Sequence, residues 1–142
     1  MYLVFEGLDK TGKGTLEKLI GKFTNYEHIV VDRGPLGYIA YDTIHNRLTD
    51  ERREMFESEW DMIKNDAVIV YCFARNETIR MRQAKHEEEV FTYDRIAREA
   101  EIYMSVISRY TGLKRCIFVD TTCMTPDECA KHIKWCIDKE NW

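Results

Sequence analysis

The segment from Gly7 to Thr15 reads GLDKTGKGT and has the residue types and spacing of a phosphate-binding loop. Glycines let the backbone wrap around a phosphate so that successive N–H groups point at it. The helix expected to follow adds positive potential, and Lys13 brings a mobile positive charge to the outer phosphates. A glycine turn that only joins a strand to a helix is the weaker alternative. The predicted nucleotide-binding residues are Gly7, Lys10, Thr11, Gly12, Lys13, Gly14 and Thr15.

The loop departs from the usual pattern at one position. The residue after Lys13 is Gly14, where a hydroxyl would normally ligate Mg²⁺, and Thr15 comes one place later. Similar Gly-Lys-Gly-Thr loops occur in adenylate kinases, so the glycine is compatible with catalysis. We expect Mg²⁺ to be held mainly by phosphate oxygens and water, with weak participation of Thr15 and with a carboxylate such as Asp32 acting through water.

The pair Asp32-Arg33 directly follows the next predicted strand. Phosphoryl transfer requires positive charge around the moving group, and the fork of Arg33 can hold an acceptor phosphate with two hydrogen bonds. Asp32 ends a strand that we expect to be buried, where an unpaired carboxylate is costly. It could hold Mg²⁺ through water or accept a proton from a hydroxyl acceptor. The alternative is a structural ion pair of Asp32 with Arg33 or with a lysine.

The elements that position these residues alternate between strand and helix along the chain. Apolar runs without polar alternation predict buried strands, and apolar residues at helical spacing predict helices. Buried strands separated by helices imply parallel pairing, so we predict a three-layer α/β sandwich, the fold of P-loop NTPases, with about four parallel strands. Thr125, Pro126 and Glu128 predict a capping box at the last helix. The predicted strands are 2–7, 28–32, 67–73 and 116–120, and the predicted helices are 16–23, 36–48, 50–64, 76–85, 96–111 and the segment from 126 onward.

Composition excludes several classes of protein. A chain of 142 residues fits one domain, residues 1–142, with a lid at roughly 75–95. A net charge of −4 argues against a partner that is an extended nucleic acid, and no apolar run is long enough for a membrane span. Five cysteines without a CxxC motif favour free thiols and a cytoplasmic location. Cys129, His132 and Cys136 invite a zinc interpretation, but an apolar helix stripe of Cys129, Ile133, Cys136 and Ile137 explains them better.

The chain resembles the thymidylate kinase family in two motifs. Phe5–Lys13 looks like the characteristic FEGLD-basic-x-GK start, and Asp32-Arg33 with Ala40-Tyr41 resembles that family's DRY-x-x-S-x-x-AYQ segment. In that segment the Tyr, Ser and Gln of the family are replaced by Gly34, Gly37 and Asp42. The likeness covers most of the chain. Family members place an extra strand and helices before the DR strand, so the shorter chain predicts a reduced acceptor half.

The resemblance assigns roles to individual residues. Lys13 acts on the outer phosphates, Arg33 contacts the acceptor monophosphate, and Asp9 contacts the sugar hydroxyl of the acceptor. Lys10 stands where some members carry an arginine that acts on the transferred phosphoryl group. Similar kinases are homodimers through helices beside the substrate site, so a homodimer is possible here. The candidate catalytic residues are Asp9, Lys10, Lys13, Asp32 and Arg33.

The lid and the aromatic residues leave alternatives open. Arg80 and Arg82 lie roughly 200° apart on the predicted helix, so we do not expect both to face one phosphate. One of them contacts the phosphates as a lid residue, or both belong to a solvated helix face. Four aromatic side chains could stack on a base, although aromatics at helical spacing are more often core: Tyr38, Tyr41, Phe91 and Tyr93.

These observations predict an ATP- and Mg²⁺-dependent kinase that transfers the γ-phosphoryl group to a small acceptor. A deoxynucleoside monophosphate similar to dTMP is the first expectation. One alternative is a nucleoside, another small molecule or a nucleic-acid group as acceptor. The other alternative is a nucleotide-binding module without catalysis, which the three glycines Gly14, Gly34 and Gly37 suggest.

Overall fold

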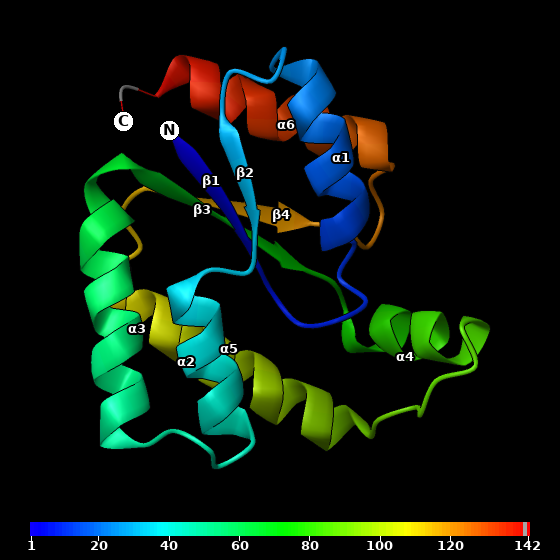
Figure 1. The fold of residues 1–142 in the computed structure, drawn as a ribbon. Coiled ribbons are helices and arrows are strands. Elements are labelled where there is room, and N and C mark those ends of the chain that lie inside the picture. Colours follow the sequence, from blue (N-terminus) through cyan, green and yellow to red (C-terminus); the bar gives the residue numbers. More distant parts are fainter. Residues whose placement is uncertain (141) are drawn as a thin grey trace.

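The computed structural model describes residues 1–140 and 142, and these form a parallel sheet of four strands covered by helices on both faces (Figure 1). The strand order is β2-β1-β3-β4, and every pairing is parallel. The predicted three-layer α/β fold is therefore confirmed. The elements are β1 (Tyr2–Glu6), α1 (Lys13–Phe23), β2 (Ile29–Asp32), α2 (Pro35–Ile44), α3 (Asp50–Ile63), the 3₁₀ helix η1 (Lys64–Asp66), β3 (Ala67–Phe73), α4 (Asn76–Lys85), α5 (Tyr93–Thr111), β4 (Cys116–Asp120) and α6 (Pro126–Lys139).

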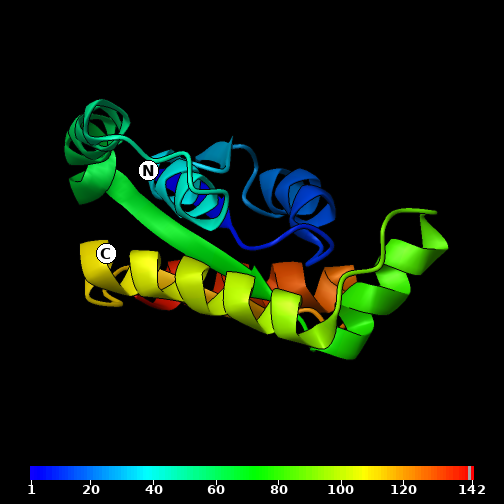
Figure 2. The same cartoon turned by 90° about the horizontal axis from the view of Figure 1, so that it is seen from below.

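The helices divide between the two faces of the sheet. α1 and α6 pack together on one face, and α2, α3 and α5 cover the other, as the two views of the ribbon show (Figures 1 and 2). α4 lies at the end of the sheet where the loop after β1 is found (Figure 1). Parallel strands place their carboxyl ends at one edge, so the loops after all four strands meet there.

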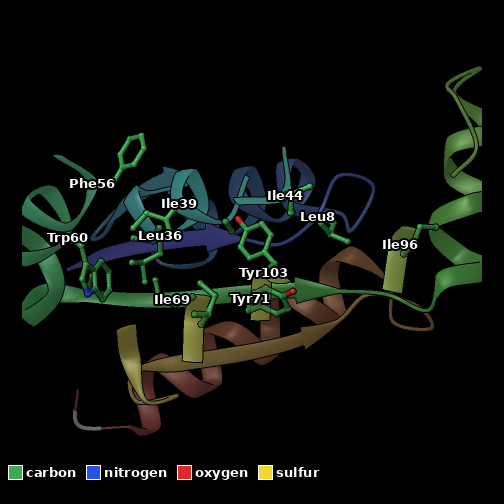
Figure 3. Packing of buried hydrophobic residues seen from close by; sticks show 14 of the residues in the cluster. Leu8, Leu36, Ile39, Ile44, Phe56, Trp60, Ile69, Tyr71, Ile96 and Tyr103 are labelled. Atoms are coloured by element: carbon green, nitrogen blue, oxygen red, sulfur yellow. The ribbon is translucent and has the colours of Figure 1, made fainter. Parts of the chain in front are cut away.

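Successive side chains of the central strands point to opposite faces of the sheet, and the buried ones form two separate cores. On β1, Leu3 and Phe5 face α1 and α6, whereas Val4 faces α2 and α5. Tyr71 of β3 and Tyr103 of α5 pack edge to face in the second core, with ring centroids 5.6 Å apart (Figure 3). The next residue on the Val4 side is Glu6, so the alternation directs a carboxyl group into an apolar layer.

Two local predictions need correction. The strand 28–32 is not buried, because β2 is an edge strand that pairs only with β1, and Ile29 and Asp32 are exposed. The helix predicted over 36–48 ends at Ile44, and residues 45–49 lead to the start of α3. Phe56 and Trp60 of α3 are buried in the core.

The last helix forms as predicted. The Thr125 hydroxyl accepts a hydrogen bond from the N–H of Glu128, and the Glu128 carboxylate accepts one from the N–H of Thr125. Cys129, Ile133 and Ile137 are buried against α1 and the sheet, and this confirms the apolar stripe. Among residues 1–140 and 142, no helix is long and apolar enough to cross a membrane.

Candidate active site at the carboxyl edge of the sheet

The predicted phosphate-binding loop lies between β1 and α1, as its motif requires. Gly7 has φ 134°, and a Cβ atom there would overlap the carbonyl oxygen of Cys72 on β3. Only glycine allows the chain to leave the sheet in this direction. The Thr11 hydroxyl donates to the carbonyl of Leu8 at 2.6 Å and closes the loop on itself.

Two residues from distant elements hold the loop in place. The Thr121 hydroxyl, directly after β4, donates to the carbonyl of Thr11 at 2.8 Å. Arg82 of α4 donates to the carbonyl of Lys10 at 2.8 Å and to the carbonyl of Thr121 at 2.9 Å. Arg82 thus ties α4, the loop and the end of β4 together. Thr121 is not among the residues predicted for the site. Its one signal in the sequence is that it directly follows a predicted strand.

Lys13 and Arg33 form a positively charged centre. Burial lowers the pKa of Lys13, and the neighbouring positive charge of Arg33 lowers that pKa further, against the opposing effect of Asp9 and Asp32. Two cations that repel each other in a partly buried site gain stability when an anion binds between them. The electrostatics of this centre therefore suit a bound phosphate.

Arg33 is held in a fixed position between the loop and α2. Its Nη2 atom donates to the Tyr41 hydroxyl at 3.1 Å and lies 3.5 Å from Asp9 Oδ1. Its guanidinium stacks on the Tyr41 ring, with Cζ 3.8 Å from the ring centroid. The backbone of Arg33 is left-handed, with φ 57°, which costs free energy in a non-glycine residue and is typical of functional sites. Its Nε atom is buried without a partner among the described residues.

A buried carboxyl group, Glu6, lies beneath Arg33. Glu6 Oε1 accepts a hydrogen bond from the N–H of Gly34 at 2.8 Å, and Oε2 accepts one from the Tyr103 hydroxyl. Burial raises the pKa of Glu6 from its usual value near 4.5 to about 7, against the opposing effects of these hydrogen bonds and of Arg33 and Lys13. Glu6 therefore fixes the backbone directly after Arg33. Glu6 belongs to the FEGLD motif, but its position in the sequence does not indicate this role.

Glu6→Gln should flatten the pH dependence of stability near neutrality. The folded-state pKa is raised, so folding takes up a proton between about pH 4.5 and 7, and the free energy of unfolding falls as pH rises through this range. A shift of this size corresponds to about 3 kcal/mol. Urea unfolding at pH 5, 6, 7 and 8 measures the free energy of unfolding of the variant and of the parent, and its dependence on pH should be weaker in the variant.

Glu17 is a second group that titrates in this range, because burial and the neighbouring Asp32 carboxyl group raise its pKa to about 7 as well. Glu17→Gln should remove a separate part of the slope, so the two effects should add in the double variant. A Glu6→Gln protein that keeps the parent's full slope would contradict the assignment.

Oxygen atoms suited to a hard cation line the mouth of the phosphate loop. Asp32 and Thr15 are both exposed there, in a pocket that also includes Lys13, and the Glu17 carboxyl group is a neighbour of Asp32. No cluster of three or more His, Cys, Asp or Glu side chains that could hold a metal occurs within the described part of the chain. This donor set fits a Mg²⁺ ion that takes most of its ligands from phosphate and water. No ion pair of Asp32 with Arg33 or with a lysine is found among the described residues.

The segment after α4 contacts the phosphate loop. Lys10, whose backbone is also left-handed at φ 68°, pairs with Glu88 at 2.8 Å. Of the two arginines of α4, Arg82 contacts the loop, whereas Arg80 stacks over the Tyr93 ring, 4.4 Å from its centroid. That the two do not face one phosphate stays a prediction.

Two further pockets flank the loop. One of about 450 Å³ lies beside α1, and its lining is Lys10, Gly12, Thr15, Leu16, Arg82, Lys85, His86, Thr121, Met124, Pro126 and Cys129. A smaller one of about 190 Å³ is lined by Leu8, Asp9, Tyr41, His45, Ile79, Gln83, Phe91, Arg95, Ile96 and Glu99. Of the four candidate stacking residues, Tyr41 and Phe91 therefore line a pocket beside the loop. Tyr38 stacks on Phe56 instead, and Tyr93 lies under Arg80.

Comparisons with known proteins show similarity of the fold. A search against protein-family models found no match, and neither did a search of curated protein sequences. Among solved structures, the YorR protein from Bacillus subtilis in complex with phosphorylated GDP is similar at a TM-score of 0.77 and 21% identity, over 97% of this chain and 96% of that chain.

Two kinases are also similar. Thymidylate kinase from Candida albicans has a TM-score of 0.62 and 16% identity, over 96% of this chain and 90% of that one. Deoxyadenosine kinase from M. mycoides with bound dCTP has a TM-score of 0.65 and 10% identity, over 99% and 100%. The resemblance that the two sequence motifs predict is thus confirmed at the level of the fold, and the chain has the three-layer α/β architecture seen in these nucleotide and nucleoside kinases.

Proposed function

We propose that the protein is an ATP- and Mg²⁺-dependent kinase that transfers the γ-phosphoryl group to a deoxynucleoside monophosphate, with dTMP as the first candidate. The observation that carries the proposal is that two positively charged side chains, Lys13 and Arg33, are neighbours at the end of the phosphate loop. One cation belongs to the donor site and the other to the segment that the motif assigns to the acceptor. An enzyme that moves a phosphoryl group between two anions needs positive charge at this junction.

The surrounding residues take complementary roles in this proposal. Lys13 stabilises charge on the transferred group, and Arg33 holds the acceptor phosphate in line with it. Asp9, which is within reach of Arg33, binds the sugar hydroxyl of the acceptor. Asp32 and Thr15 orient the water around Mg²⁺, which, when bound, neutralises charge on the donor phosphates. The nucleoside part of ATP then occupies the pocket of about 450 Å³ beside α1.

We further propose that residues 1–142 act as one kinase domain and that the segment 75–95 is its lid. The Lys10–Glu88 ion pair supports this, because it joins the lid to the phosphate loop. When ATP binds, Lys10 exchanges the Glu88 carboxylate for the transferred phosphoryl group. Arg82 remains on the backbone carbonyls and keeps the loop in shape, so its contribution is positional.

A second acceptor class has its own supporting observation. Glu17 is a neighbour of Asp32, and burial together with the Asp32 carboxyl group raises the Glu17 pKa to about 7, so the site has a carboxyl pair that can take up a proton near neutral pH. A hydroxyl acceptor must lose a proton, whereas a phosphate acceptor need not. The alternative acceptor is therefore a deoxynucleoside, which the M. mycoides deoxyadenosine kinase also makes worth testing.

An acceptor panel tests the proposal. ADP formation should appear only when a suitable acceptor is added, and the eight substrates are the four deoxynucleosides and their four 5′-monophosphates. dGMP belongs in the panel with dTMP because the YorR protein was solved with phosphorylated GDP. Magnesium should be required, so EDTA should abolish the reaction. Tight ATP binding without turnover on any of the eight would instead support the binding module without catalysis.

A further inference from the structure

A pocket of about 420 Å³ opens next to Arg33, away from the phosphate loop itself. It is formed by α2, the loop after it and the first turn of α3, and it is lined by Arg33, Tyr38, Tyr41, Asp42, Arg47 and Arg52. Three arginines therefore line this pocket together with a single carboxylate, Asp42, in a protein whose net charge is −4. Such a local excess of positive charge against the overall sign calls for a ligand.

The single carboxylate positions the arginines without using up their donors. The Asp42 side chain is only 5% exposed, and its Oδ2 atom accepts a hydrogen bond from Arg52 Nε at 2.6 Å. Arg47 Nε lies 4.0 Å from Oδ1 of the same residue. Both contacts go through Nε. Within residues 1–140 and 142, the terminal Nη groups of Arg47 and Arg52 make no hydrogen bond, so the ends of both forks can donate to a ligand.

A purely structural network explains only part of this cluster. The Asp42–Arg52 pair joins α2 to α3 and satisfies a buried carboxylate. Arg47 adds little to that purpose, because its side chain is 64% exposed and its ion pair is long. Its placement at the same pocket is accounted for by a ligand that needs a second guanidinium.

We propose that this pocket binds a phosphate group in addition to the one held by Arg33. Arginine forks match phosphate oxygens with paired hydrogen bonds, and Arg47 and Arg52 provide two forks at one place. Because Arg33 lines the same pocket, the phosphate is supplied by the acceptor. The acceptor class is therefore a nucleotide with phosphates on two sugar positions, such as a nucleoside 3′,5′-bisphosphate. In such an acceptor the 3′-phosphate takes the place of the sugar hydroxyl that Asp9 binds in a monophosphate. The identity of this ligand as the acceptor rests on the proposed function, and a free phosphate ion is the other possible source.

Binding of thymidine nucleotides to the full chain tests the proposal by calorimetry. Thymidine 3′,5′-bisphosphate should bind at least about 10-fold more tightly than thymidine 5′-monophosphate, since each added charge-assisted phosphate contact contributes more than about 1.4 kcal/mol. Arg47→Gln should bring the ratio of the two dissociation constants close to one. Arg52→Lys, which keeps a positive charge beside Asp42 but loses the fork, should lower the ratio as well.

Arg53→Gln is the matched control. Arg53 is the neighbour of Arg52 on α3, pairs with Asp50 at 3.3 Å and lines a different pocket, so the same change in charge should leave the ratio as in the parent. Urea unfolding of each variant shows that it is folded.

Three results distinguish the possibilities. An Arg47-dependent advantage of the bisphosphate supports a second phosphate on the acceptor. Equal binding of the two nucleotides, together with Arg47-dependent binding of inorganic phosphate, supports the same site with a free ion as its ligand. No effect of Arg47 on either ligand would overturn the site. If Arg47 has no effect but the acceptor panel shows kinase activity, the proposed function stands and only the second phosphate site is wrong. If binding depends on Arg47 but no acceptor is turned over, the site stands and only the proposed function is wrong.

Discussion

Lys13→Ala should lower kcat for acceptor-dependent ADP formation at least about 100-fold, by comparison with the loss of other electrostatic donors that act on a transition state. Lys13 is the cation next to the transferred group in the proposed site. Within the described part of the chain, the other lysine that lines the phosphate loop is Lys10, which is paired with Glu88. Initial rates at saturating ATP and acceptor measure the effect.

The stability of the Lys13→Ala variant shows whether a loss of activity comes from unfolding. Burial and Arg33 lower the Lys13 pKa, so the charged lysine is less favourable in the folded protein than in the unfolded one. Its removal should therefore leave the free energy of unfolding at neutral pH unchanged or higher. Lys18→Ala, at an exposed position of the same helix, is the control and should retain parent activity. Turnover near the parent value in Lys13→Ala would rule out the assigned role.

Gly37→Ala should destabilise the protein by at least about 2 kcal/mol, as overpacking of a filled core does. A Cβ atom at Gly37 would overlap Glu6 Oε2 and would lie 2.5 Å from Arg33 Cγ and 2.8 Å from the Tyr103 hydroxyl. Glu6 cannot simply move away, because Gly34 and Tyr103 hold both of its oxygens. The strain must move Arg33 or separate α2 from the sheet.

Two measurements follow from this crowding. Urea unfolding at pH 7 should show the loss of stability, and the KM for the acceptor should rise more than the KM for ATP because Arg33 is displaced. Gly14→Ala is the control for stability. Nothing lies within 4 Å of a Cβ atom at Gly14, which is in α1, so alanine there should raise stability by about 0.5–1 kcal/mol. Equal stabilities of the two variants would show that the Glu6 packing is not as tight as described.

The same packing bears on the departures from the thymidylate kinase pattern. Gly34 and Gly37 stand where the resembled family has tyrosine and serine, and this raised the alternative of a binding module without catalysis. In the structure, Gly37 makes room for the buried Glu6–Tyr103 pair, and the N–H of Gly34 binds Glu6. These substitutions are therefore explained by packing beneath Arg33, and they do not by themselves argue against activity.

Much of the fold could be predicted from the sequence because its signals are local. The order of strands and helices, the loop between β1 and α1, and the cap at Thr125 all depend on residues within a few positions of one another. The buried state of β2 was predicted wrongly for the opposite reason. Its apolar run is the same in the middle or at the edge of a sheet, and only the strand order places it at the edge.

The sequence by itself determined that Lys13 lies between a strand and a helix, and that Asp32 and Arg33 are adjacent at the end of the next strand. It also determined that Arg80 and Arg82 point in different directions, since a helix sets that angle from spacing alone. Only the tertiary structure decided that Glu6 supports Arg33, that Thr121 and Arg82 hold the phosphate loop, and that Arg47 and Arg52 face the same pocket as Arg33. The residues brought together in this way are between 14 and 110 positions apart in the chain. They meet because whole helices and strands pack together, and a local sequence pattern does not predict that packing.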